Sequence, residues 1–181
     1  MDNKPHFPYF PDAYAHVFEE EAGVCSVCGQ ARNCRYTGSF YAVDEPDYLC
    51  PWCIADGSAA RKYEGCFTDD YCIEGVSPNP ADPPSTIPTD LLRAITDKTP
   101  TYHSWQQQTW LSHCNQPCVF LGYADKTTLA PFADEVLPDL KAFNAKDYAW
   151  LLEHLSKDGN IVGCLFACKC CGQHRLHIDL S

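Results

Sequence analysis

The stretch that decides the fold is Leu49-Cys50-Pro51-Trp52-Cys53-Ile54-Ala55-Asp56-Gly57, where two cysteines stand two residues apart just before a predicted helix. A pair of the same spacing, Cys25-Ser26-Val27-Cys28, comes earlier in the chain, and 21 residues separate Cys28 from Cys50. Two intervening residues let both thiolates of a pair reach one ion, and four thiolates form a closed tetrahedral zinc site. We therefore predict a structural zinc with no open position for a substrate. The predicted ligands are Cys25, Cys28, Cys50 and Cys53.

An alternative for Cys50-Pro51-Trp52-Cys53 is a thioredoxin-like redox pair. That interpretation requires a buried strand leading into a long helix, and Asp47-Tyr48-Leu49 is a poor strand.

The N-terminus lacks a basic start followed by an apolar stretch, and no run of 18 apolar residues occurs, so we expect a cytoplasmic protein without a membrane span. In that compartment the 13 cysteines act as metal ligands more readily than as disulfides.

A second zinc site is predicted near the C-terminus. Cys168-x2-Cys171-Gly172 has the same knuckle form and stands at the tip of a hairpin predicted from strands at 161–167 and 174–179. The predicted ligands are Cys114, Cys118, Cys168 and Cys171. Imidazole also suits zinc, so the alternatives are His113, His174 and His177. Cys114 and Cys118 can also be read as ordinary buried cysteines near a helix end.

Short elements and turns are expected throughout, because the 181 residues include 14 prolines and 10 glycines. The predicted fold is α+β: a small zinc-stapled domain with short strands, zinc-ribbon-like knuckles and about four helices. Those helices are predicted at 54–63, at 90–96 after Thr89, from Ser104 to Leu111, and through 148–155 after Asn144. The chain divides into a strap and four-cysteine module (1–75), a proline-rich linker (76–88) and a helical region with the knuckle hairpin (89–181), together one compact unit.

The chain is strongly acidic, with a net charge of -11. Nucleic-acid binders need a basic face, so the charge argues against DNA or RNA as a partner, although Arg32, Arg35, Arg61 and Lys62 form a local basic group. An acidic surface instead attracts a basic protein, and it also simply keeps a protein soluble. Candidate partner-binding residues are Asp44, Glu45, Asp47, Asp69, Asp70, Glu74 and Trp105.

No catalytic residues are predicted. The sequence lacks a His-Glu-x-x-His motif, a phosphate-binding glycine loop and a Gly-x-Ser-x-Gly elbow. Cys50-Pro51-Trp52-Cys53 also lacks the upstream His-x-Glu of zinc deaminases. The remaining alternative is a zinc-dependent enzyme or stress-response regulator in which the second zinc keeps an open position.

Several segments along the chain form a specific pattern. They are Cys25-x2-Cys28-Gly29, Tyr36-Thr37-Gly38-x-Phe40-Tyr41, Leu49 to Ala59, Thr99-Pro100-x-Tyr102-x-x-Trp105-Gln106, Trp110-Leu111-x-His113-Cys114, Phe120-Leu121-Gly122 and Leu165-Phe166-x-Cys168-x-x-Cys171-Gly172. Together they resemble the CbrC-like family of small bacterial proteins, which is named for tolerance to a nuclease-type colicin. The resemblance implies a zinc-binding protein that withstands a bacteriocin or toxin, with no established enzyme activity. We therefore expect a toxin-tolerance or immunity protein that binds and neutralises a basic bacterial toxin.

Overall fold

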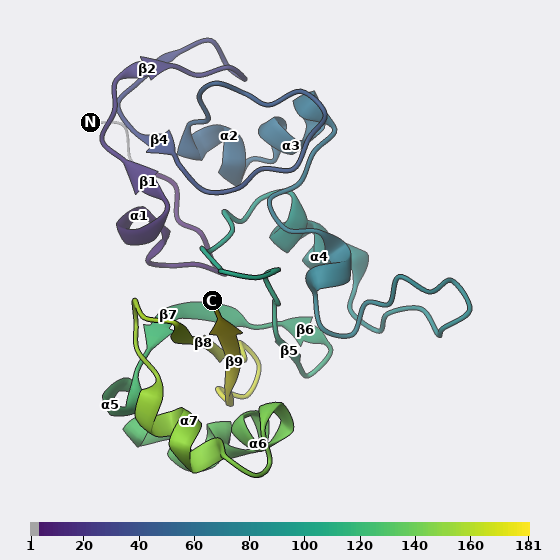
Figure 1. Cartoon of the computed structure of the whole chain (residues 1–181). Coiled ribbons are helices and arrows are strands. Elements are labelled where there is room, and N and C mark those ends of the chain that lie inside the picture. Colours follow the sequence, from purple (N-terminus) through teal and green to yellow (C-terminus); the bar gives the residue numbers. More distant parts are fainter. Residues whose placement is uncertain (1–3) are drawn as a thin grey trace.

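The computed structural model describes residues 4–181 and confirms the α+β class (Figure 1). Residues 1–3, the start of the predicted strap, lie outside the described residues. The strands are β1 Phe18–Glu19, β2 Gly23–Val24, β3 Ala31–Arg32, β4 Arg35–Tyr36, β5 Ser112–His113, β6 Gln116–Pro117, β7 Val119–Ala124, β8 Ile161–Ala167 and β9 His174–Leu180. The α-helices are α1 Ala13–His16, α2 Pro51–Ala55, α3 Ser58–Tyr63, α4 Thr89–Thr96, α5 Lys126–Leu129, α6 Ala133–Phe143 and α7 Tyr148–His154, and short 3-10 turns occur at Asp70–Cys72 and Ala130–Phe132.

The largest sheet has the antiparallel order β7-β8-β9, and the predicted C-terminal hairpin is confirmed. Its central strand β8 is buried from Val162 to Phe166 because both of its faces are covered. Val162, Cys164 and Phe166 face the main core. Leu165 faces a second core built with α6 and α7, which lie below the sheet in Figure 1. A strand buried on both faces reads as a continuous apolar run.

The main core joins the N-terminal strap to this sheet. The ring of Phe10 meets the ring of Phe120 edge-on at 4.8 Å between centroids. The backbone N–H of Phe120 donates to the carbonyl of Tyr9 at 2.9 Å. Trp110, fully buried, donates its indole N–H to the carbonyl of Cys118 at 2.9 Å. Aromatic burial of this kind holds segments that are distant in sequence in one core.

The helix predicted from Ser104 to Leu111 is wrong. The backbone N–H of Trp110 donates to the carbonyl of Cys72 at 2.8 Å, and the Trp110 carbonyl accepts from Glu74 at 2.9 Å. The Trp105 amide donates to the carboxylate of Asp179. Because these long-range bonds use the groups that a helix needs internally, tertiary contacts override the local capping signal.

Other helix boundaries also differ from the sequence prediction. The helix expected at 54–63 is split into α2 and α3 by Gly57, whose φ is +73°. Helix α6 was not predicted and contains Pro138, which weakens a helix signal. The side chain of Asn144 accepts from the amides of Lys146 and Asp147, so it orders the turn before α7 and does not cap that helix. The described chain therefore has more and shorter helices than the predicted four.

Residues 76–88 form no helix or strand, and Figure 1 shows this segment as a long loop that projects beside α4. The loop is held at its end by Ile87, which is buried in the main core. Within residues 4–181, every helix is too short or too polar to cross a bilayer.

Candidate metal centres

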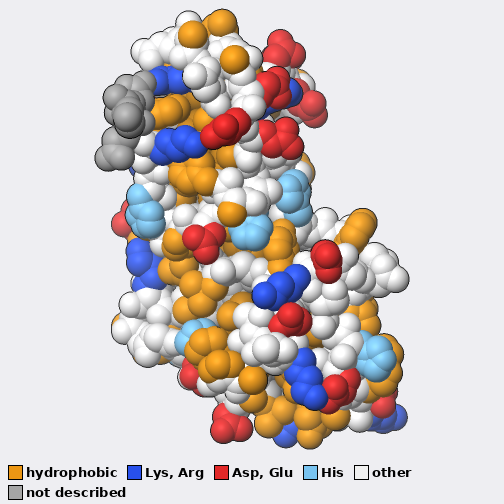
Figure 2. Space-filling model, turned by 90° about the vertical axis from the view of Figure 1, so that its left-hand side faces the viewer, with side chains coloured by type: hydrophobic (Ala, Val, Ile, Leu, Met, Phe, Trp, Pro, Cys, Tyr) orange, Lys and Arg blue, Asp and Glu red, His pale blue; other side chains and the backbone are white. Residues whose placement is uncertain are grey.

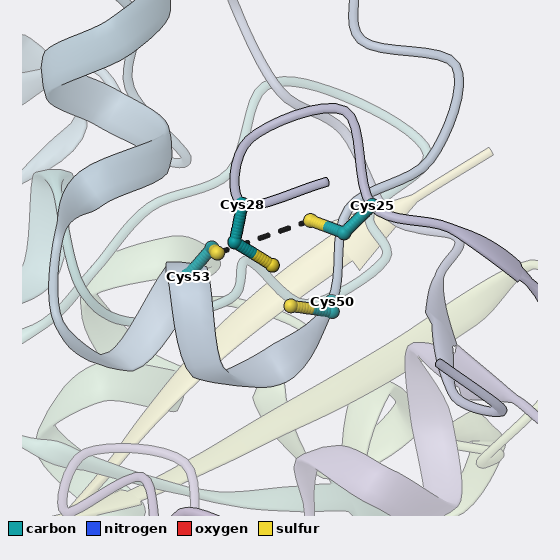
Figure 3. A group of neighbouring side chains, drawn as sticks. All are labelled: Cys25, Cys28, Cys50 and Cys53. Atoms are coloured by element: carbon teal, nitrogen blue, oxygen red, sulfur yellow. Dashed lines mark hydrogen bonds between the residues drawn. The ribbon is translucent and has the colours of Figure 1, made fainter. Parts of the chain in front are cut away.

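The first centre consists of the four cysteines of the two N-terminal pairs (Figure 3). Cys25 and Cys28 lie in the turn after β2, and Cys50 and Cys53 lie at the start of α2. Figure 3 shows the four sulfurs directed toward one another from the turn and from the helix. All four Sγ atoms lie within 4.8 Å of one another, and those of Cys25 and Cys53 are 3.8 Å apart.

This geometry fits a metal ion. A tetrahedron with Zn–S bonds of 2.3 Å has S···S edges of about 3.8 Å, and the Cys25–Cys53 separation is 3.8 Å. A disulfide requires about 2.05 Å between sulfurs, and all four cysteines are free. Cys25, Cys50 and Cys53 are buried, and Cys28 is exposed. The group can therefore hold an ion near the surface with most of its shell covered by protein.

A local turn explains how the first pair is positioned. The amide of Gly29 donates to the carbonyl of Cys25 at 2.8 Å, and the amide of Cys25 donates to the carbonyl of Gln30 at 3.0 Å. Gly29 has φ +69°, a left-handed conformation that glycine adopts at no steric cost. The Ser26 amide donates to the Tyr48 carbonyl at 2.9 Å, and the Tyr48 amide donates to the Ser26 hydroxyl at 3.1 Å. These bonds tie the turn to the segment that leads into Cys50.

Hydrogen bonding and burial shift the pKa values of Cys25, Cys50 and Cys53. The Cys50 thiol donates to Cys25, and this bond outweighs burial and lowers the pKa of Cys25 to about 4. The same bond raises the pKa of Cys50, and burial raises that of Cys53 to about 11. A metal binds thiolates, so loading the centre releases the remaining protons and is favoured at higher pH.

The second centre combines His113 with Cys114, Cys168 and Cys171. The Nδ1 atom of His113 lies 3.3 Å from the Sγ atoms of Cys114 and Cys171, which are 3.8 Å apart. The four donor atoms lie within 4.8 Å of one another. One imidazole and three thiolates are a common set of structural ligands, and four protein donors leave no open position. Cys114 and Cys171 are exposed, so this centre is more open to solvent than the first.

Each of the two centres contains a turn of the same kind. The amide of Cys168 donates to the carbonyl of Gln173, and the amide of Gly172 donates to the carbonyl of Cys168, both at 2.9 Å. These bonds repeat those of Cys25 with Gln30 and Gly29. Gly172 also has a left-handed backbone, with φ +77°. The sequence Cys-x-x-Cys-Gly-Gln therefore forms one knuckle twice in this chain.

The other half of the second centre sits on a strained hairpin. Cys114 and Asn115 connect β5 to β6, with φ +53° and +55°. This conformation costs a residue other than glycine roughly 1–2 kcal/mol. Such strain persists where the surrounding structure or a function requires it. Here it directs the Cys114 sulfur toward Cys171.

Cys118 is not part of the group that the structure brings together. It is fully buried beside Trp110 in the main core, and burial raises its pKa to about 12. His113 ends β5, directly beside the tight turn at Cys114, whereas the chain has already entered the core at Cys118. The other two histidines point elsewhere: His174 stacks on Phe132 and contacts Glu135, and His177 lies in β9 outside the group.

The thiol of Cys168 ionises more readily than an ordinary cysteine, because its pKa is lowered. Burial opposes its ionisation, but the amides of Cys171 and Cys170 and contacts with His113 outweigh burial and lower its pKa to about 6. Its sulfur also lies 3.9 Å from the amide nitrogen of Gln116, a weak donor contact from β6. Groups of this kind orient metal ligands and tune their basicity.

Comparison with known proteins places both centres in a family context. The model of the uncharacterised protein family UPF0167 matches residues 4–180, nearly the whole chain. The chain belongs to the UPF0167 family. A UPF0167 protein of Pseudomonas aeruginosa is 36% identical over 187 residues, which cover 98% of this chain and 97% of the relative. UPF0167 proteins of Mycobacterium bovis and Mycobacterium tuberculosis are each 31% identical, with 98% of this chain and 94% of each relative covered. No solved structure matches.

In this chain, three segments that carry predicted partner-binding residues lie side by side. Tyr41 and Cys66 exchange two backbone hydrogen bonds, of 2.8 and 2.9 Å. The Tyr41 hydroxyl donates to the side chain of Gln108 at 3.2 Å, and the side-chain amide of Gln107 lies 3.1 Å from the sulfur of Cys72. The loop after Tyr41, the turn before Cys72 and the loop around Trp105 are therefore neighbours.

These segments carry exposed apolar side chains as well as carboxylates. Val43 is fully exposed and Trp105 is 64% exposed. The exposure of Tyr41, Val43 and Tyr71 was not predicted from the sequence, because exposed side chains in irregular segments leave no periodic signal. We call this region the acidic–aromatic surface. It comprises Tyr41, Val43, Asp44, Glu45, Asp47, Asp69, Asp70, Tyr71 and Trp105, all of them exposed.

Glu74 differs from the other predicted contact residues because its carboxylate is already engaged. Arg175 donates to Glu74 at 3.1 Å, to Asp139 at 2.9 Å and to the carbonyl of Ser112 at 2.8 Å. Burial opposes ionisation of Glu74, but Arg175 and the Ser112 amide outweigh it and lower the pKa. Glu74 is therefore a structural group that steadies β5, the strand that carries His113.

Replacing Arg175 by methionine is expected to lower the free energy of unfolding by about 3 kcal/mol, because the poorly exposed carboxylate of Asp139 loses its partner. Urea unfolding of the metal-loaded protein measures this change. The matched control is Arg35→Met. Its ion pair with Glu21 is well exposed, so the control should cost less than about 1 kcal/mol. Equal costs for the two variants would contradict a special role for Arg175.

Proposed function

We propose that this UPF0167 protein is a zinc-stapled binding protein that captures a basic protein through its acidic–aromatic surface. The observation that carries the proposal is the grouping of exposed aromatic side chains and carboxylates from three distant segments. Tyrosine and tryptophan are enriched among residues that dominate binding energy. The carboxylates supply charge complementarity, which speeds association with a basic partner.

The charge of the whole molecule supports the same proposal. The net charge is -11. On the face drawn in Figure 2, aspartate and glutamate side chains gather at the upper right, whereas charges of both signs are scattered below. An uneven negative field of this kind steers a basic protein toward one region of the surface and repels phosphates.

Both metal centres are proposed to bind zinc and to act structurally. Thiolate and imidazole donors at tetrahedral spacing suit zinc, and four protein donors per centre close the coordination shell. A closed shell has no position for water or a substrate, so it does not favour the alternative of an open catalytic zinc. The role of zinc is then to hold the loops that carry the binding surface.

The proposed partner is a nuclease-type bacterial toxin, and the proposed outcome is tolerance of that toxin in the cytoplasm. Enzymes that act on nucleic acid carry a basic face, and an acidic inhibitor complements it. The resemblance to the CbrC-like colicin-tolerance family supports this choice. Calorimetry at low salt with a basic toxin encoded beside the gene tests it, and absence of binding to every such toxin would sink the proposal.

Neutralising Asp44, Glu45 and Asp47 to Asn, Gln and Asn is expected to slow association with the basic partner about tenfold at low salt, because three steering charges are lost. The effect should shrink as salt rises toward 1 M, where the Debye length falls to about 3 Å. Stopped-flow association rates measure both trends.

The control neutralises three exposed carboxylates in the region of helices α6 and α7: Asp134 in α6, Asp147 in the turn before α7 and Glu153 in α7. It removes the same net charge, so it separates a local contact from the general field of the protein. The control is expected to slow association less than threefold. If both triple variants slow association equally, the acidic–aromatic surface is not the docking site.

A further inference from the structure

A cavity of about 430 Å³ lies next to the acidic–aromatic surface, where the loop around Trp105 meets β7, β8 and β9. Its volume falls within the range of pockets that take small ligands or single side chains. Neither metal centre contributes to it. The residues of its lining that matter here are Trp105, Tyr123, Lys157, Asp158 and Asp179.

Residues 103–106 form one wall of the cavity, and hydrogen bonds from Asp179 and Tyr123 hold this loop in place. Asp179 is 3% exposed, and its carboxylate accepts from the amide of Trp105 at 2.6 Å and from that of Gln106 at 3.1 Å. The hydroxyl of Tyr123 donates to the carbonyl of His103 at 2.9 Å. A loop fixed by such bonds presents its side chains in one arrangement, which lowers the entropic cost of binding.

One side chain in this wall lacks the contacts that it usually makes. Trp105 leaves 64% of its surface exposed beside the cavity, although tryptophan is highly buried on average. The indole is covered if a ligand with a flat face stacks on it.

The charges around the cavity favour a cation. Asp158 and Asp179 contribute two carboxylates, and Lys157 contributes one ammonium group. The protein as a whole adds a negative field. A cation over tryptophan or tyrosine is also stabilised by the ring quadrupole. Among organic cations, a guanidinium combines a flat face that stacks on indole with several N–H donors.

We propose that this pocket receives the guanidinium group of an arginine on the basic partner. The inference rests on the proposed function, and it identifies the side chain that anchors the complex. The guanidinium stacks on Trp105 and is neutralised by Asp158. Buried arginine anchors of this type dominate binding energy in many interfaces.

The test uses N-acetyl-arginine amide as the probe and its neutral isostere, N-acetyl-citrulline amide, as the matched control. Proton–nitrogen NMR of the full-length, metal-loaded protein reports the indole N–H signals, and Trp105→Phe assigns that of Trp105. The arginine probe is expected to shift the Trp105 signal and to bind about tenfold more tightly than citrulline. Equal binding of the two probes would overturn the proposal.

Variants sharpen the test. Trp105→Ala is expected to abolish saturable binding of the probe, whereas Trp150→Ala, which removes another exposed tryptophan, leaves it unchanged. Lys157→Ala is expected to tighten binding several-fold, because it removes the one cation from the lining. An anion-binding pocket would show the opposite sign, and weaker probe binding by Lys157→Ala would refute the cation assignment.

The outcomes for the pocket and for the proposed function can be told apart. If a basic partner binds wild type and Trp105→Ala equally and the arginine probe causes no shift, the pocket proposal fails and the binding function stands. If the probe binds as described but no basic protein does, the pocket stands and the proposed function fails. Loss of partner affinity in Trp105→Ala together with probe binding to wild type supports both.

Discussion

Replacing Cys50 by alanine is expected to unfold the chain, even with excess zinc present. A structural zinc held by thiolates contributes about 10–16 kcal/mol of binding free energy that exists only in the folded state. A whole domain is stable by about 5–15 kcal/mol. Cys50 is fully buried and belongs to the main core that also contains Phe10 and Phe120. The loss of this ligand therefore affects the whole main core.

Circular dichroism and metal analysis of the purified protein measure this effect. Wild type should carry two zinc ions per chain and unfold cooperatively. Cys34→Ala is the matched control, because Cys34 is also a buried cysteine of the main core but lies outside both metal groups. It should keep both ions and cost only about 1–2 kcal/mol, as for a small cavity. A folded Cys50→Ala protein with two bound ions would overturn the assignment of the first centre.

The second centre is expected to lose its ion when His113 is replaced by alanine, while the fold survives. Strand β8 pairs with both β7 and β9 along its length, so the hairpin persists without the metal. An ion present at about a thousand times its dissociation constant contributes about 4 kcal/mol. That loss corresponds to a fall in melting temperature of roughly 10 °C for a chain of this size.

Cys118→Ala provides the contrast, because Cys118 was the ligand predicted from sequence. In the structure Cys118 is buried beside Trp110, away from His113. The variant should keep two zinc ions and lose only the packing of one sulfur atom. Metal analysis distinguishes the two assignments directly. One ion in Cys118→Ala and two in His113→Ala would restore the prediction from sequence and contradict the structural one.

The cysteine pairs show how much of the metal centres can be predicted from the sequence. The Cys-x-x-Cys spacing is a local property of one turn, and it identified Cys25, Cys28, Cys50 and Cys53 as a group that the structure brings together. It also identified Cys168 and Cys171. The partner half of the second centre was ambiguous, because the choice between His113 and Cys118 depends on the turn at Cys114. That turn has a left-handed backbone, which a cysteine in the sequence does not predict.

The secondary structure likewise divides into elements that local residues predict and segments that long-range contacts decide. The apolar strand from Ile161 to Ala167 and its alternating return strand were predicted correctly, because a hairpin is defined by its own residues. The segment from Ser104 to Leu111 carries a capping pattern and two tryptophans, yet it forms no helix. Its amides bond to Asp179 and to the backbone near Cys72, residues that are distant in sequence.

The sequence by itself determined the cysteine turns of the candidate metal centres, the α+β class and the acidic charge, since each depends on residue type or on local spacing. Only the tertiary structure decided which surface those charges share. Tyr41, Cys72 and Trp105 come from three segments that are joined through Cys66, Gln107 and Gln108. The pocket at Trp105 likewise depends on the buried carboxylate of Asp179, 74 residues away. Long-range contacts of this kind leave no local pattern, because the energy that selects them comes from burial and from hydrogen bonds formed after the chain has folded.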